Sequence, residues 1–236
     1  MAGRTIGGVA AGVAVLGLVL SGCGSTDSTA EKTSESSSAS ESSSASSSSA
    51  APSSTTAAAS PDQTIDDYLS ANGIERTFVH PGDPGIPDLK LPTPAGWRIL
   101  EGAEAPETAW GVIVLDDPAA GSNRPAIIAT MAKLTGGEPD PATLLKLAPN
   151  ALKKLPEFDG PETGQEGEFA GFQAATIGGT FVQDGVNMLV ARKTVVIPGK
   201  DAVYLLALDV QGSEDYATQM MDATVAIDAE TTITVP

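Results

Sequence analysis

The chain has 236 residues and a formal net charge of -17, with one cysteine, Cys23, and one histidine, His80. An electrostatic field this acidic repels phosphate backbones, so the composition excludes nucleic acid as a partner. A single cysteine cannot form an internal disulfide, so the stability of any folded part must come from packing.

The first 22 residues predict a lipoprotein signal peptide. Residues 6–20 follow Arg4 and are mostly apolar, but they are diluted by glycine and are fewer than the roughly 20 residues that a spanning helix needs. They run into Leu20-Ser21-Gly22-Cys23, which resembles a bacterial lipobox. This motif implies cleavage between Gly22 and Cys23. It also implies that Cys23 then carries an S-diacylglycerol group and an N-acyl group, with palmitate as the expected fatty acid. The alternative is an uncleaved membrane helix with an incidental cysteine.

Residues 23–60 predict a lipidated cysteine followed by a disordered tether. The segment after Cys23 is nearly all Ser, Ala and Thr and has no aromatic residue, so it cannot bury enough surface to fold. Its r.m.s. reach is about 35 Å. Both a bare spacer and an O-glycosylated one fit this composition. Two or three acyl chains hold a protein stably at a membrane, so we expect the outer, extracytoplasmic face of the cell membrane as the location.

Residues 61–236 predict a single globular domain. They hold all ten aromatic residues, and 26 acidic residues against 11 basic ones give this part a net charge of -15. The length is comfortable for one domain. Because anionic lipid surfaces repel such a domain, we expect contact with the membrane through the anchor.

The first predicted element of the domain is a short helix from Thr64, with Asp67 at the third position of a capping box. It ends before Gly73, and residues 75–80 then read as extended chain. Five prolines between positions 81 and 94 predict a long loop.

Six further segments predict β-strands, separated mostly by turn residues. They are residues 97–100, 109–115, 125–133, 171–182, 186–197 and 202–210. Asp184-Gly185 and Pro198-Gly199 are hairpin signals. In the run from Val203 to Leu208 both alternating sets are apolar, which predicts a strand covered on both faces.

Two further helices can supply the covering layers. Residues 140–155 have leucines at helical spacing, with Pro149 expected to kink or split the helix. Residues 213–227 begin with Ser213 as a cap, followed by acidic residues in the first turn. The predicted fold class is α+β, a layered sandwich with a mainly antiparallel sheet flanked by helices.

Two stretches of the domain form recognisable motifs, the helix end Tyr68-Leu69 followed by Gly73 and the loop Leu91-Pro92-Thr93-Pro94-Ala95-Gly96-Trp97. With these two motifs the domain resembles the mycobacterial LpqN/LpqT lipoproteins. The resemblance extends over the whole domain in the order of its elements. It implies a Mog1/PsbP-like fold, an extracytoplasmic location in actinobacteria with a mycolate envelope, and an accessory role in envelope biogenesis near lipid assembly. It implies no enzyme mechanism.

The residues offer little for catalysis, for a metal or for a cofactor, and none of the three is predicted. His80 and the three serines of the domain, Ser70, Ser122 and Ser213, leave few members for a nucleophilic triad. The acidic residues follow no calcium-loop spacing. Four of them, Asp159, Glu162, Glu166 and Glu168, predict a solvated loop. Hydrolytic activity therefore stays a weaker hypothesis than the two functions considered below.

An internal apolar cavity is a hypothesis that the strand composition raises. Small residues such as Gly178 and Gly179 on predicted strands either let a helix approach closely or leave a cavity. Its lining would include adaptable methionines and one indole, although the same residues also fill gaps in ordinary cores. The candidate lining residues are Trp97, Met131, Met188, Met220 and Met221.

Two functional hypotheses follow from these patterns. The first is a non-enzymatic accessory or binding protein for an apolar envelope component, a lipid or glycolipid. The second is an adaptor that docks on an envelope transport complex or on a host protein, favoured by the acidic surface. A continuous apolar cavity of about 300 Å³ or more inside the sandwich would favour the first, because ligand pockets usually begin near that volume, and its absence would favour the adaptor.

Overall fold

The computed structural model describes residues 62–100 and 102–236, and these lie in one compact unit, Ala58–Pro236. The leader, Cys23 with its predicted lipid, and the tether lie outside the described residues. Within the described ranges no helix is both long and apolar enough to cross a membrane. The described residues form three α-helices, α1 (Ile65–Ala71), α2 (Pro141–Leu147) and α3 (Ala217–Glu230). Four 3₁₀ helices accompany them, η1 (Gly102–Glu104), η2 (Pro118–Asn123), η3 (Ala148–Lys154) and η4 (Glu214–Tyr216).

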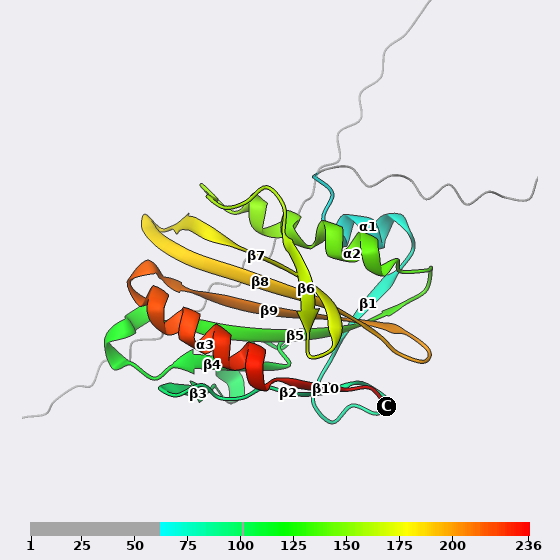
Figure 1. Ribbon diagram of the computed structural model, residues 1–236, viewed down its shortest axis with the longest axis horizontal. Coiled ribbons are helices and arrows are strands. Elements are labelled where there is room, and N and C mark those ends of the chain that lie inside the picture. The colour runs from blue at the N-terminus through cyan, green and yellow to red at the C-terminus, as the bar shows by residue number, and fades with distance from the viewer. Residues whose placement is uncertain (1–61, 101) are drawn as a thin grey trace, which may run out of the picture. The chain divides into compact units, whose positions relative to one another are not determined.

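An antiparallel sheet forms the centre of the unit. Its strands are β1 (Glu75–Val79), β3 (Trp97–Ile99), β4 (Gly111–Leu115), β5 (Ala126–Thr135), β6 (Gln165–Phe169), β7 (Phe172–Gln183), β8 (Val186–Pro198) and β9 (Val203–Ser213). Their order is β3-β4-β5-β9-β8-β7-β6, and β1 also pairs with β5. Figure 1 shows α3 running across the front of β4, β5 and β9, with α1 and α2 lying together away from it. The α+β fold with a mainly antiparallel sheet is therefore confirmed.

Alternate residues of the same strands pack on opposite faces of the sheet, as the pleat of a strand requires. On the first face, hereafter the α3 face, the apolar face of α3 covers Ile127 and Met131 of β5 together with Leu206 and Leu208 of β9. The predicted double coverage of β9 is confirmed, because Leu205 belongs to a separate cluster on the other face.

The second face, hereafter the groove face, is covered by α1, α2 and η3. Leucines of α2 pack with Leu134, Val196 and Leu205 of the sheet. Leu152 of η3 continues this layer over Ile177 of β7. Two hydrogen bonds between residues far apart in the sequence hold α1 against the other helices. Asp140 N–H donates to Tyr68 Oη at 3.1 Å, and Asn150 Nδ2 donates to the Gln63 carbonyl at 2.7 Å.

The helix boundaries follow from local chemistry. Thr64 and Asp67 form the predicted capping box, with Asp67 N–H donating to Thr64 Oγ1 at 3.2 Å. Pro149 splits the second helical segment into α2 and the 3₁₀ helix η3, as expected of a residue that lacks the amide hydrogen. Ser213 caps the 3₁₀ helix η4 and not α3. α3 begins at Ala217, directly after η4 ends.

Three short strands were not anticipated. β2 (Asp88–Lys90) lies inside the proline-rich loop and pairs with β10 (Thr232–Thr234) in a separate two-stranded sheet. β6 contains Glu166 and Glu168, so the prediction of a solvated loop there is wrong for these two residues. Glycine and acidic residues concealed the strand, although its side chains before Phe169 are exposed as expected.

Gly179 in β7 allows a neighbouring loop, and not a helix, to pack closely on the strand. A Cβ atom on Gly179 would lie 2.4 Å from the Asp159 carbonyl oxygen and 2.8 Å from the Phe158 ring. Asp159 forms an isolated bridge with Thr180 at this point. The small residue therefore lets the segment after η3 lie directly on the strand.

Candidate functional site

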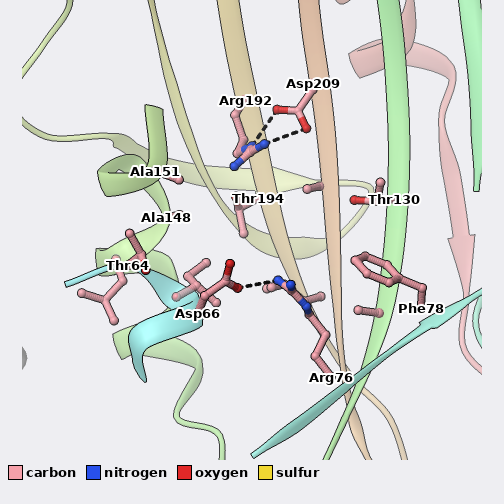
Figure 2. A pocket seen from close by; sticks show the side chains of 15 residues that line it. Thr64, Asp66, Arg76, Phe78, Thr130, Ala148, Ala151, Arg192, Thr194 and Asp209 are labelled. Carbon is pink, nitrogen blue, oxygen red and sulfur yellow. Dashed lines mark hydrogen bonds and ion pairs between the residues drawn. The ribbon is translucent and has the colours of Figure 1, made fainter. Parts of the chain in front are cut away.

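A groove of about 290 Å³ opens on the groove face where the helical layer leaves part of the sheet uncovered. Its floor comes from β5, β8 and β9, one wall from β1, and the other wall from the start of α1 and the α2–η3 junction (Figure 2). The lining residues are Thr64, Ile65, Asp66, Arg76, Phe78, Thr130, Ala132, Leu147, Ala148, Ala151, Arg192, Thr194, Leu205, Ala207 and Asp209.

An ion pair between β8 and β9 forms part of the floor. Arg192 and Asp209 are direct partners in the antiparallel register. The contact is bidentate, with Nε donating to Oδ1 at 2.6 Å and Nη2 donating to Oδ2 at 2.9 Å. Burial alone would lower the pKa of Arg192, but the Asp209 carboxylate and, more weakly, Asp66 outweigh this effect and raise it. The guanidinium therefore stays charged in the groove.

A second ion pair joins the two walls. Arg76 Nη1 of β1 donates to Asp66 Oδ1 of α1 at 2.5 Å. The Arg76 guanidinium carbon also lies 5.1 Å from the centre of the Phe78 ring, which is within cation–π range. Each arginine in the groove is thus matched by one carboxylate, and the groove carries no net formal charge within a strongly acidic domain.

Two threonines complete the polar lining of the floor. Thr194 of β8 is only 2% exposed, and Thr130 of β5 is partly buried. Each hydroxyl can donate one hydrogen bond and accept others, so the two threonines add polar groups to the floor.

The residues proposed to line an apolar cavity do not meet in one place. Trp97, Met131 and Met220 are packed in the core cluster of the α3 face, and Met188 lies in the cluster under η3. Met221 is 69% exposed on α3, so its prediction as a cavity residue is wrong. None of the five lines the groove. The four buried side chains fill the core instead, which is the ordinary role of such residues.

None of the candidate hydrolytic residues lines the groove. The exposed His80 ring has its Nε2 2.7 Å from the Glu107 carbonyl oxygen, and Ser213 Oγ accepts from Asp215 N–H at 3.4 Å. Ser70 and Ser122 are exposed. Among residues 62–100 and 102–236, no group of three metal-ligating side chains comes together.

Sequence reasoning missed Arg192 and Asp209. The signal that could have found them is a basic residue in one strand of a hairpin and an acidic residue in the other. The turn after Pro198 sets a register that places these two residues directly opposite each other.

The described domain is thus an antiparallel α+β sandwich that carries one amphipathic groove and no assembled catalytic group among its lining residues. The family profile described as "Probable lipoprotein LpqN" matches residues 61–234. The chain belongs to this LpqN lipoprotein family.

Two matches to LpqN agree with the family match. The chain is 44% identical to Lipoprotein LpqN of Mycobacterium tuberculosis over 178 residues, which covers 75% of this chain and 76% of that protein. It is also similar to a crystal structure of LpqN, described as involved in cell envelope biogenesis of Mycobacterium tuberculosis. That match has a TM-score of 0.69 and 43% identity, and it covers 75% of this chain and all of the other. A variant of protein Mog1 matches with a TM-score of 0.36 and 14% identity.

Proposed function

We propose that this lipoprotein is anchored through Cys23 on the outer face of the cell membrane and binds an amphiphilic envelope component, a lipid or glycolipid, without converting it. The observation that supports this proposal is the groove, whose volume of about 290 Å³ is near the lower limit for ligand sites. Membership of a lipoprotein family supports the anchor, and the role of the related LpqN in envelope biogenesis supports the class of ligand.

The groove lining suits an amphiphile because polar and apolar groups alternate over a short distance. Ile65 and Leu147 offer apolar surface on the helical side, and Leu205 of β9 adds apolar surface on the floor. Arg192 keeps N–H donors beyond the two that Asp209 uses, and Thr194 adds a hydroxyl to the lining. A ligand with acceptor oxygens beside an apolar chain satisfies both sets of groups.

The test is a search for bound cargo. The lipoprotein, purified from an actinobacterial envelope in mild detergent, should release a stoichiometric lipid or glycolipid in native mass spectrometry. Ala151→Trp fills the groove from its half-buried rim and should reduce the cargo at least tenfold. Ala229→Trp, on the exposed side of α3, is the matched control and should leave the cargo unchanged. Equal cargo in both variants, or none in the parent, would contradict the proposal.

The adaptor hypothesis stays as a second candidate because α3 presents an unusual surface. Met221 and Val225 are 69% and 68% exposed and lie one helical turn apart. α3 has no basic residue, so a partner with an apolar pocket rimmed by lysine or arginine would suit it. Crosslinking in cells should capture an envelope or host protein in this case, and Met221→Ser with Val225→Ser should abolish the product while the groove variant does not.

A further inference from the structure

The two ion pairs of the groove lie at different depths. Arg192 and Asp209 have side chains that are 30% and 17% exposed, and both sit on neighbouring strands in a fixed register. Arg76 and Asp66 are 36% and 65% exposed and come from two separate elements, β1 and α1. Thr194 is the most buried of these five groups, at 2%. Exposure therefore increases from Thr194 through Arg192 to Asp66, which places the Asp66–Arg76 pair toward the mouth.

Figure 2 shows the Asp66–Arg76 pair reaching from the α1 side to the β1 side, in front of the strands that carry Arg192 and Thr194. We propose that this ion pair is a latch across the mouth of the groove, which opens to admit an occupant, while Arg192–Asp209 stays formed. The identity of the occupant rests on the proposed function, but the latch itself concerns access to the groove floor.

The contacts around the latch favour a movement of Arg76 over a movement of α1. α1 is held by its capping box and by the hydrogen bond from Asp140 to Tyr68. Arg76 lies on an edge strand with a long side chain, and its only charged partner described is Asp66. Asp66 also interacts favourably with the Arg192 charge, so its carboxylate keeps a cationic neighbour when Arg76 swings away.

Ionic strength should control this latch. Ion pairs between exposed side chains are weak and are screened by salt, whereas partly buried pairs are screened much less. Added salt should therefore open the mouth without disturbing the floor.

Access to the floor can be measured without knowing the ligand. A chain that starts at Gly24 contains no cysteine, so Thr194→Cys introduces a single thiol at the deepest polar position. Its reaction with 4,4′-dithiodipyridine, an uncharged disulfide, releases thiopyridone that absorbance records. Adding Asp66→Asn should speed this reaction about 1.5- to 5-fold at low salt, the range expected for loss of an exposed ion pair. Salt should accelerate the reaction of the parent and not of the variant.

The control replaces a matched ion pair elsewhere. Arg98 and Asp116 lie 3.4 Å apart with side chains 43% and 64% exposed, and neither lines the groove. Asp116→Asn should leave both the rate and its salt response unchanged. Arg76→Gln breaks the latch from the other side and should match Asp66→Asn, with circular dichroism melting curves showing that each variant is folded.

Equal labelling rates and equal salt responses in the parent and in both latch variants would overturn the latch. Its failure is separable from failure of the proposed function. Faster labelling of the latch variants without any lipid cargo supports the latch and contradicts lipid binding. Equal labelling rates together with lipid cargo contradict the latch and support lipid binding.

Discussion

The two faces of the β8–β9 hairpin are made from alternate residues of the same two strands, yet they differ in packing and chemistry. On the α3 face, Val195 and Leu206 are fully buried in one apolar cluster. On the groove face, Arg192, Thr194 and Asp209 lie where the helical layer is incomplete. A shift of one residue along a strand therefore separates structural core from candidate site, because successive side chains point to opposite faces.

The groove face should therefore tolerate substitutions with a smaller loss of stability than the α3 face. A closed core loses both transfer free energy and packing when a side chain is shortened. A solvent-open groove can readmit water, so its polar residues contribute less to stability and are free to serve binding.

Met131→Ala tests whether Met131 is core, as its complete burial on the α3 face indicates. The free energy of unfolding should fall by about 2–5 kcal/mol, because a buried methionine leaves a cavity when truncated. Urea denaturation followed by tryptophan fluorescence measures the loss. Met221→Ala on the exposed side of α3 is the matched control and should change stability by less than about 0.5 kcal/mol. Similar values for both would show that the α3 face is not the closed core described.

Asp209→Asn tests the groove face. It leaves the Arg192 guanidinium without its carboxylate, and the free energy of unfolding should fall by about 1–3 kcal/mol. The same denaturation experiment measures the change.

The double replacement Arg192→Met with Asp209→Leu separates stability from binding. An apolar pair of similar volume often matches or exceeds the stability of an ion pair, so stability should return to about the parental value. Cargo binding should be lost in this variant, because the charged groups of the floor are gone. Recovery of both properties would mean that the ion pair has no part in recognition.

Much of the fold could be predicted from the sequence because its signals are local. The capping box at Thr64, the break at Pro149 and the hairpin at Asp184-Gly185 each depend on residues close together in the chain. The apolar character of both sides of β9 predicted layers on both faces, which the two clusters confirm.

The groove could not be predicted in the same way because it depends on distances between elements. Its walls come from residues near 65, 76 and 148, and no local pattern states that these meet over β8 and β9. The methionines wrongly suggested a cavity for a related reason. A methionine that fills a closed core and a methionine that lines an apolar cavity look the same in the sequence. Only the packing of α3 shows that Met220 is buried and that Met221, the next residue, is not.

The helices of the two faces begin differently, which predicts a smaller loss of stability than the loss expected for Asp209→Asn. Asp140 caps α2 by accepting from Thr143 Oγ1 at 2.6 Å and from Thr143 N–H at 2.9 Å, whereas no side chain caps α3 at Tyr216. These hydrogen bonds from Thr143 hold the pKa of Asp140 below its ordinary value of 3.8. Asp140→Ala should therefore cost about 0.5–2 kcal/mol at pH 7.

The pH dependence of this loss identifies the carboxylate as its cause. Because the pKa of Asp140 is lowered in the folded state, the stabilisation is complete above the unfolded value and disappears as the pH falls through the folded value. The difference between parent and Asp140→Ala should be constant from pH 7 to about pH 5 and shrink below about pH 4. Asp140→Asn keeps a neutral cap, so its stability should exceed that of Asp140→Ala over the whole range. A difference that persists unchanged at the lowest pH where the protein stays folded would assign the effect to packing, and the groove-face helix would then resemble α3 in needing no charged cap.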